Sequence, residues 1–463
     1  MIAKKHHKIK YLVVLTFVFL LGQALYTQLV VSVPAHAETT AYANEKPIDF
    51  KEDKAKAKEW GKEKKKEFKK NLTKNEEKAL DDYMSDKNDI QKKFMEKNYM
   101  SVDDWDKVSA NEISKKEKTL MKNLATTLEK ANISETVITY KGMDESQLAF
   151  HEELFSGGKP NEEATAKFKQ QLLDKNILLD NYLTTELTVP KLENNERILL
   201  EVKIPKGGKG SPFTKVKGSI WTNKKSEYGV IVDHSYQLHV NEIKQVIIKG
   251  KKCEKVITEL QEVKDFKNDI NGVGEKWTFN QFKPWVKQLE PAEKNTIVDY
   301  VENSAGQMNR YLREDGTGNE KLETKITDLT KALEKASLPE NLVVYRRTGA
   351  LEYGLDPAKE YSIKELDNLI KETIVEHKGF LSTSISSTPK SFESNAFIVR
   401  LLVPKGTHGA YLSQVIKEPG LEEHAKEKEF LINKGSKYQI HSVKEIVVRG
   451  QKKVVVDAEL LSE

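Results

Sequence analysis

The stretch Asp49-Phe50-Lys51-Glu52-Asp53 near the start of the chain returns almost unchanged as Asp265-Phe266-Lys267-Asn268-Asp269. Each copy is followed at similar spacing by a tryptophan, Trp60 and Trp277 respectively. Three further pairs of strings recur in the same order: Val137–Lys141 with Val343–Arg346, Ile204–Gly207 with Val403–Gly406, and Val246–Gly250 with Ile446–Gly450. Self-similarity that keeps its order indicates a duplicated domain. We therefore predict two tandem domains of similar fold, over about 38–263 and 264–463.

Each copy combines two kinds of local pattern. The first third is charged with apolar residues at helical spacing, as in the lysine-rich stretch 51–80, which is typical of a solvated amphipathic helix. The later two thirds contain short β-rich runs, such as 197–204, 396–403 and 443–448, separated by Gly and Pro turns. This order predicts an α+β fold in which N-terminal helices precede a mainly antiparallel β core.

The composition excludes several classes of protein. A chain of 463 residues with 38% hydrophobic and 32% charged residues can bury a core, which excludes fully disordered, collagenous and multispanning chains. The net charge of +5 comes mostly from four lysines within residues 1–37, so we expect no overall attraction to nucleic acid. Cys253 is the only cysteine, which excludes an internal disulfide and a thiolate metal cluster, and the ten histidines show no spacing typical of zinc ligands.

The first 37 residues have the order of a secretory signal. A basic stretch, Lys4–Lys10, precedes an apolar run, Tyr11–Leu21, and Ala35-His36-Ala37 supplies a small-residue cleavage site. We therefore predict a secreted protein that begins near Glu38. The alternative is an uncleaved membrane anchor, but the apolar run is short for a membrane span. We expect no stable membrane insertion.

Three sites in the β-rich part of the second copy carry candidate chemistry. Arg346 and Arg347 end an apolar strand, where a guanidinium can bind a phosphate with two hydrogen bonds. In Ser382-Thr383-Ser384 the two serines share one face of a strand. Glu427 and Glu429 begin an apolar strand, and in extended backbone both carboxylates face the same way. Each site alone also fits a surface charge or a polar edge strand, and the order of all three favours a function.

Paired carboxylates of this kind suit the cleavage of a glycosidic bond to a positively charged leaving group. One acid can hold a ribose hydroxyl and stabilise an oxocarbenium-like centre, while the other hydrogen-bonds the incoming nucleophile.

The first copy serves as an internal control. Through the flanking matches, Lys141 aligns with Arg346, Thr184-Thr185-Glu186 with Ser382-Thr383-Ser384, and Lys225-Ser226-Glu227 with Glu427-Lys428-Glu429. The scaffold positions are kept while each of the three candidate motifs is altered. We infer that the second domain reacts and the first only binds.

An aromatic-Arg pair, an S-T-S run and an E-x-E run, in a secreted two-domain chain with a degenerate first copy, resemble the enzymatic component of binary actin-ADP-ribosylating toxins. The iota-toxin-like group of clostridia and the vegetative insecticidal toxins of bacilli are the most similar groups. Three strings resemble in particular the insecticidal branch, vegetative insecticidal protein two: Lys56–Glu63, Gly318–Leu322 and Gly409–Ser413. The resemblance covers essentially the whole mature chain and implies an ADP-ribosyltransferase-like fold.

The resemblance implies transfer of ADP-ribose from the co-substrate NAD to an arginine of host actin, with release of nicotinamide. A separate pore-forming component would deliver the enzyme into the host cytosol. In this reading Arg346, supported by Arg347, binds the NAD phosphates, and Ser382 positions Glu429. Glu429 holds the nicotinamide-ribose hydroxyl, and Glu427 serves the acceptor arginine. Further residues implied in NAD binding are Tyr300, Asn309, Phe392 and Ser384, of which Tyr300 and Phe392 equally fit ordinary packing.

Several positions depart from the family pattern. The loop 414–426 is longer than usual, and His424 stands where the family commonly has an aromatic residue that contacts the protein substrate. Ala305, Leu351 and Asn395 replace a tyrosine, a glutamine and an arginine of the NAD pocket. These changes leave the core chemistry in place and bear on the target and on NAD affinity.

Two alternatives remain at this point. An NAD glycohydrolase would use water as the acceptor. The presence of Glu427 argues against it, since hydrolysis has less need of the outer carboxylate. If the chain were a non-enzymatic adaptor for a pore-forming partner, the candidate motifs of the second copy should be altered as those of the first are. The second copy keeps them, which argues against the adaptor. In the transferase reading, the first domain is expected to dock on the pore-forming component.

Overall fold

The computed structural model describes residues 46–85, 114–179, 182–214, 228–233, 235–266, 272–387, 394–416, 422–448 and 451–461. The predicted secretory signal 1–37 and the predicted NAD-pocket residue Phe392 lie outside these ranges. Pro47–Glu463 forms one compact unit. Within the described ranges, no helix combines the length and the apolar character that are needed to cross a membrane.

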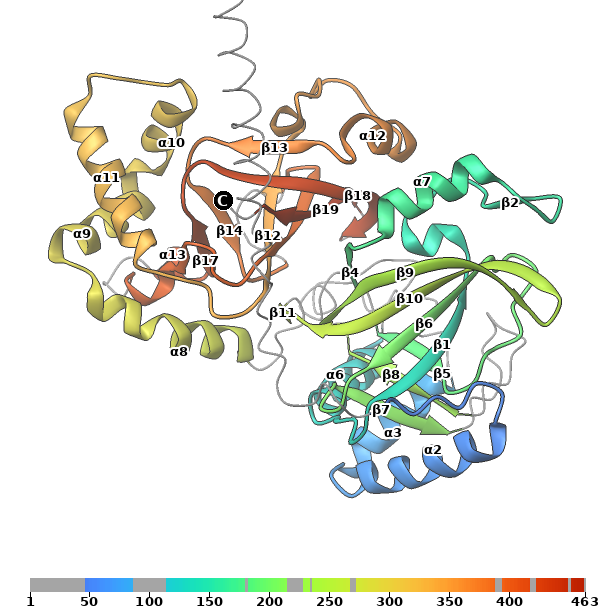
Figure 1. Cartoon of the computed structure of the whole chain (residues 1–463). Coiled ribbons are helices and arrows are strands. Elements are labelled where there is room, and N and C mark those ends of the chain that lie inside the picture. Colours follow the sequence, from blue (N-terminus) through green and yellow to red (C-terminus); the bar gives the residue numbers. More distant parts are fainter. Residues whose placement is uncertain are drawn as a thin grey trace, which may run out of the picture. The chain divides into compact units, whose positions relative to one another are not determined.

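The first copy consists of helices followed by a sheet (Figure 1). Its helices are α2 (Lys54–Lys69), α3 (Lys74–Met84), α6 (Lys115–Glu129) and α7 (Glu162–Leu172). The sheet has the order β4-β9-β10-β6-β1-β5-β8-β7. Its strands are β1 (Val137–Met143), β4 (Asn176–Leu178), β5 (Leu183–Glu186), β6 (Ile198–Ile204), β7 (Gly210–Thr214), β8 (Tyr228–Val232), β9 (Tyr236–Ile248) and β10 (Lys251–Glu262).

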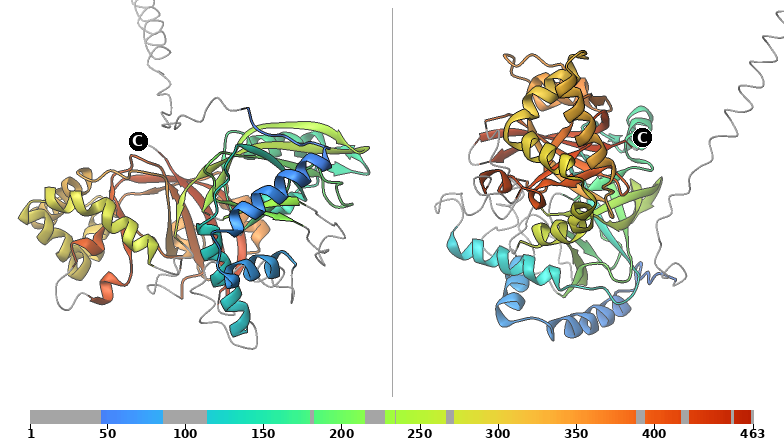
Figure 2. Two further views of the ribbon diagram at one scale, coloured as in Figure 1. Left: turned by 90° about the horizontal axis from the view of Figure 1, so that it is seen from below. Right: turned by 90° about the vertical axis from the view of Figure 1, so that its left-hand side faces the viewer.

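The second copy repeats this plan. Helices α8 (Val273–Gln288), α9 (Pro291–Asp299), α10 (Ala305–Arg313) and α11 (Glu320–Glu334) come first, and α12 (Ile363–Ile370) and α13 (Glu422–Ala425) follow. Figure 2 shows the yellow helices α8 to α11 together on one side of the second sheet. The sheet has the order β13-β18-β19-β15-β12-β14-β17-β16, with β11 also paired to β12. Its strands are β11 (Lys264–Asp265), β12 (Leu342–Thr348), β13 (Ile374–His377), β14 (Leu381–Ser384), β15 (Phe397–Val403), β16 (Gly409–Tyr411), β17 (Glu429–Ile432), β18 (Ser436–Val448) and β19 (Gln451–Leu460).

The two sheets have equivalent strand orders. In each path, one strand pair is parallel, β6 with β10 and β15 with β19, and the other pairs are antiparallel. The predicted α+β class with two similar, mainly antiparallel domains is therefore confirmed.

The repeated sequence strings make the same contacts in both copies. The Tyr140 hydroxyl donates to Asp49 Oδ1 at 2.6 Å, and the Tyr345 hydroxyl donates to Asp265 Oδ1 at 2.7 Å. The phenylalanine that follows each aspartate also packs against the tryptophan of its copy. The ring centroids of Phe50 and Trp60 are 5.9 Å apart, and those of Phe266 and Trp277 are 5.4 Å apart. A hydrogen bond to a charged group contributes about 1.5–3 kcal/mol. These contacts join the start of each domain to its central strand, which explains why the strings recur.

The central strand β12 of the second copy separates two apolar clusters. Leu342 and Val344 belong to the main core, which also contains residues of helices α8 and α11. Val343 and Tyr345 belong to a different cluster. Because successive side chains of a strand alternate between its faces, the next residue, Arg346, lies on the face of the main core.

Candidate active site

Arg346 lies near the end of β12 and contacts two other segments. Its Nη1 donates to the Ser382 carbonyl oxygen at 3.0 Å, and its Nε and Nη2 donate to Glu352 Oε2 at 3.2 and 3.1 Å. Burial disfavours the charged guanidinium, but the Glu352 carboxylate more than offsets this and raises the pKa of Arg346. The guanidinium is therefore charged and fixed in orientation.

Glu352, in the short 3-10 helix Ala350–Tyr353, is the centre of this polar network. It also accepts hydrogen bonds from the Thr348 hydroxyl at 2.5 Å and from the Tyr438 hydroxyl at 2.7 Å. Burial acts to raise the pKa of Glu352, but Arg346 and the two hydroxyls lower it to about 2. The sequence analysis missed Glu352 and Tyr438, because neither belongs to a recognisable motif and 86 residues separate them.

Ser382 and Glu429 lie on the neighbouring strands β14 and β17. The Ser382 hydroxyl donates to Glu429 Oε1 at 2.5 Å. Burial raises the pKa of the Glu429 carboxyl to about 7, with a further contribution from Glu427, although Ser382 and Arg346 act in the opposite direction. Glu429 is thus close to half ionised at neutral pH.

Glu427 reaches the site from a turn. The expectation that Glu427 and Glu429 share one extended strand is wrong: β17 begins only at Glu429, and Lys428 has a left-handed φ of 52°. The backbone N–H of Glu427 donates to the His424 carbonyl at 3.0 Å, which continues the chain from α13. The Ser384 hydroxyl donates to the Glu427 carbonyl oxygen at 2.8 Å and so ties this turn to β14.

The two hydroxyls of the S-T-S run therefore have different partners. Ser382 holds the carboxylate of Glu429, whereas Ser384 is buried and holds the backbone of the turn. The predicted contact of Ser384 with NAD stays a prediction.

Tyr300 and Asn309 pack against the start of β14. Asn309 Nδ2 donates to the Tyr300 hydroxyl at 3.0 Å, and Asn309 Oδ1 accepts from the Phe380 backbone N–H at 2.8 Å. The rings of Tyr300 and Phe380 meet edge to face at 5.8 Å. These contacts hold the region of α10 against the strand that carries Ser382, and the predicted NAD contacts of Tyr300 and Asn309 stay predictions.

The other positions singled out in the sequence are Arg347, Leu351, Asn395, Ala305 and the loop 414–426. Arg347 follows Arg346 on β12 and is buried. Because successive side chains of a strand alternate between its faces, Arg347 lies on the opposite face of the sheet from Arg346. Leu351 is 74% exposed beside Glu352, and the carbonyl oxygen of Asn395 accepts from Lys453 Nζ at 2.9 Å. Ala305 begins α10. Of the loop 414–426, residues 417–421 lie outside the described part of the chain.

Strand register identifies the equivalent positions of the first copy. Tyr140 pairs with Glu186 as Tyr345 pairs with Ser384, which confirms the predicted match of residues 184–186 with 382–384. The next pair, Glu186 with Gly229, corresponds to Ser384 with Glu429. Gly229, two residues beyond Glu227, is therefore the equivalent of Glu429, and the sequence alignment at this point is wrong by two residues. Residues 225–227 lie outside the described ranges.

Packing leaves no room for a carboxylate at Gly229. A Cβ atom there would collide with the carbonyl oxygen of Thr185 and with the ring of Phe213. The first copy therefore lacks the carboxylate of Glu429, and the Thr185 carbonyl and the Phe213 ring occupy the space that its side chain would need.

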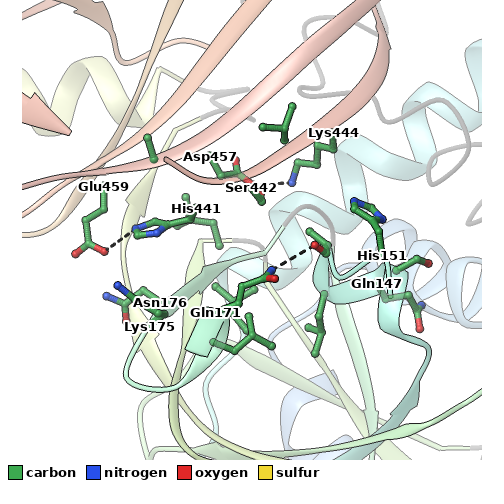
Figure 3. A pocket seen from close by; sticks show the side chains of 18 of the residues that line it. Gln147, His151, Gln171, Lys175, Asn176, His441, Ser442, Lys444, Asp457 and Glu459 are labelled. Atoms are coloured by element: carbon green, nitrogen blue, oxygen red, sulfur yellow. Dashed lines mark hydrogen bonds and ion pairs between the residues drawn. The ribbon is translucent and has the colours of Figure 1, made fainter. Parts of the chain in front are cut away.

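A separate cavity of about 310 Å³ lies between segments of the two copies (Figure 3). His441 Nε2 lies 3.4 Å from Glu459 Oε2 and Lys444 Nζ lies 2.9 Å from Asp457 Oδ2 among its lining residues. None of the predicted catalytic or NAD-binding residues lines this cavity. Among the residues that the structure describes, no group of three or more His, Cys, Asp or Glu side chains could hold a metal ion.

A charged arginine, a serine-bound glutamate and a second glutamate on this duplicated sheet are the arrangement that the resemblance to ADP-ribosyltransferases implied. Residues 57–264 and 274–463 both match the family ADP-ribosyltransferase exoenzyme. The chain therefore belongs to this family, whose co-substrate is NAD.

Solved structures and a curated relative agree with this assignment. The ADP-ribosylating toxin BECa of a binary enterotoxin of C. perfringens, solved with NADH, is 26% identical with a TM-score of 0.71, covering 90% of this chain and 99% of that one. The enzymatic component C2-I of the C2-toxin from Clostridium botulinum shares the fold at 21% identity and a TM-score of 0.68, covering 90% and 100%. NAD(+)–arginine ADP-ribosyltransferase EFV of Enterococcus faecalis is 30% identical over 178 residues, 35% of this chain. The chain spans about a third, 31%, of the length of that relative.

The resemblance to enzymatic components of binary ADP-ribosylating toxins is confirmed by these matches. Assignment to the insecticidal branch stays a prediction.

Proposed function

We propose that the chain is a secreted toxin enzyme that transfers ADP-ribose from NAD to an arginine of a host protein, with actin as the favoured target. The observation that carries this proposal is the Ser382–Glu429 pair beside the charged Arg346. The equivalent positions of the first copy are Thr184, Gly229 and Lys141.

The first step is cleavage of the bond between the nicotinamide nitrogen and C1′ of the ribose. Arg346 binds the NAD phosphates, and ionised Glu429 accepts a hydrogen bond from a ribose hydroxyl. The negative charge of Glu429 stabilises the oxocarbenium-like centre as neutral nicotinamide leaves with the bonding electrons. Ser382 supports this role, because its hydrogen bond fixes the Glu429 carboxylate.

The second step is attack by the acceptor arginine. A guanidinium is protonated and is a poor nucleophile, so a carboxylate must orient it and accept a proton as its nitrogen bonds to C1′. Glu427 is the residue proposed for this task, and its influence on the pKa of Glu429 supports it, since the two carboxyl groups must lie near one another. The name of the Enterococcus faecalis relative supports arginine as the acceptor.

The first copy has a different proposed role. We assign 38–263 to a domain that docks on a separate pore-forming component and 264–463 to the catalytic domain. The end of β10 at Glu262 and the start of β11 at Lys264 support this boundary. The names of BECa and C2-I, both parts of toxins with more than one component, support a separate component, which in this proposal delivers the enzyme into the host cytosol.

The test is transfer of labelled ADP-ribose from NAD to purified actin, run beside an assay for free nicotinamide. Wild type is compared with Glu429→Gln, Glu427→Gln and, as a control, Glu360→Gln, which alters an exposed carboxylate that is not among the proposed site residues. We expect labelled actin with wild type and the control, and none with either site variant. Release of nicotinamide without labelled actin would keep the NAD site and refute actin as the target. The absence of both labelled actin and free nicotinamide would refute an enzymatic function and favour an adaptor.

A further inference from the structure

The Glu352 network determines which hydrogen-bond donors of Arg346 can meet a ligand. A guanidinium has five N–H groups on three nitrogens. Nε and Nη2 each donate to Glu352, and Nη1 donates to the Ser382 carbonyl. These contacts leave one N–H on Nη1 and one on Nη2 for an incoming anion, in an orientation that the protein has already fixed.

We propose that Glu352 is a positioning residue for NAD, which fixes the Arg346 guanidinium in the orientation that binds the dinucleotide phosphates. This inference rests on the proposed function. Thr348 and Tyr438 hold Glu352 itself, so three segments of the second copy, β12, the 3-10 helix and β18, combine to place one guanidinium.

The Glu352 network is also connected to Glu429, the residue proposed to bind the nicotinamide ribose of NAD. Ser382 accepts from Arg346 through its backbone carbonyl and donates to Glu429 through its hydroxyl. The orientation of the phosphate-binding arginine and that of the ribose-binding carboxylate are therefore linked through a single residue. A rotation of Arg346 would release one of the contacts that place Ser382.

The first copy shows that the fold does not require this network. Register and helix position make Lys141, Gln147 and Leu238 the equivalents of Arg346, Glu352 and Tyr438, so all three members are replaced. The Tyr–Asp bond of the central strand is kept in both copies. A buried ion pair is weak evidence for stability, since its desolvation offsets much of its attraction. Loss of the whole network together with the Glu429 carboxylate points to a role in binding NAD.

Glutamine at position 352 would disturb this arrangement with little change of volume. The partners of the Glu352 carboxylate are the Arg346 guanidinium and the hydroxyls of Thr348 and Tyr438, all of which donate to it. An amide presents an NH2 group to one of these donors and carries no charge to hold the guanidinium. Arg346 then samples other rotamers, and binding of the phosphates must again order it.

The experiment measures the dissociation constant for NAD by calorimetry and the kinetics of NAD cleavage, using the full chain. The variants are Glu352→Gln, Tyr438→Phe and the control Glu293→Gln. Glu293 forms another carboxylate–cation pair of the second copy, with Lys335 at 2.7 Å, and its side chain is 7% exposed compared with 11% for Glu352. Thermal unfolding of each variant reports on the fold.

We expect Glu352→Gln to raise Kd and KM for NAD by about tenfold or more while kcat changes less, as for loss of a hydrogen bond to a charged group. Tyr438→Phe should act in the same direction with a smaller effect, and Glu293→Gln should lower the melting temperature without changing KM. A folded Glu352→Gln variant with unchanged Kd and KM would overturn the inference. If Glu352→Gln does not fold, an unchanged Kd in Tyr438→Phe overturns it. If the wild-type chain neither binds nor cleaves NAD, the proposed function is refuted, and the inference that rests on it is refuted as well.

Discussion

Replacement of Glu429 by glutamine should stabilise the protein at alkaline pH and have little effect on stability near pH 4. The carboxyl has a pKa of about 7 in the folded chain against an ordinary value of 4.5. At about 1.4 kcal/mol per pH unit, this difference corresponds to up to about 3 kcal/mol. Because the pKa is raised on folding, the favourable contribution of the protonated acid is complete below pH 4.5 and is lost as the pH rises through 7. Glutamine resembles the protonated acid at every pH and avoids this loss.

The assay is thermal unfolding of wild type and Glu429→Gln at pH 4.5 and pH 8.5, with the exposed Glu360→Gln as the control. If the second copy unfolds as a unit, about 3 kcal/mol corresponds to a gain of roughly 6–12 °C for the glutamine variant at pH 8.5. At pH 4.5 the two proteins should melt at nearly the same temperature. A gain of equal size at both pH values, or a loss at pH 8.5, would refute the reasoning, because neither result follows from a carboxylate that is destabilised by burial.

Four further predictions concern activity, packing and the reactivity of the cysteine. Cleavage of NAD by wild type, measured as nicotinamide release, should rise about 50-fold between pH 5 and pH 7 and only about twofold above pH 7, since Glu429 acts in its ionised form. Ser382→Ala removes a hydrogen bond that favours this form, so the midpoint of the pH profile of kcat/KM should move to higher pH. Gly229→Ala in the first copy should lower the free energy of unfolding by about 1–3 kcal/mol in urea titrations, because the added Cβ meets the Thr185 carbonyl, and an unchanged value would contradict the packing seen there. Cys253 is buried and burial raises its pKa to about 11, so a thiol reagent should label it only after unfolding.

The duplicated architecture could be predicted because the repeated residues make local and specific contacts. Asp49 and Asp265 hold the tyrosine of the central strand, and the tryptophans Trp60 and Trp277 pack on the neighbouring phenylalanines. Residues under such constraints change little between copies, so they remain visible in the sequence. The order of the strands was not predictable in the same way, since pairing between distant segments leaves no periodic pattern.

The errors in the candidate site also have physical causes. An E-x-E run favours an extended reading, but the left-handed backbone of Lys428 is set by the contacts of the turn to β14 and not by its own residue type. The match of Glu227 with Glu429 relied on the flanking repeated strings, which do not fix the length of the loop between them, whereas the strand register selects Gly229. Glu352 escaped notice because its partners come together only when the sheet forms.

The way in which the first copy lost its chemistry bears on where its function lies. At the position of Glu429 it has a glycine whose surroundings, the Thr185 carbonyl and the Phe213 ring, have closed over the space that a side chain would need. Burial lowers the pKa of Lys141, the equivalent of Arg346, which weakens its value as a binder of anions. Restoring a single residue could not rebuild an NAD site under these conditions, because the space for the carboxylate is occupied and lysine stands in place of the arginine. In the proposed function the first copy docks on the delivery component, so substitutions on its outer surface should impair delivery while leaving NAD cleavage by the second copy unchanged.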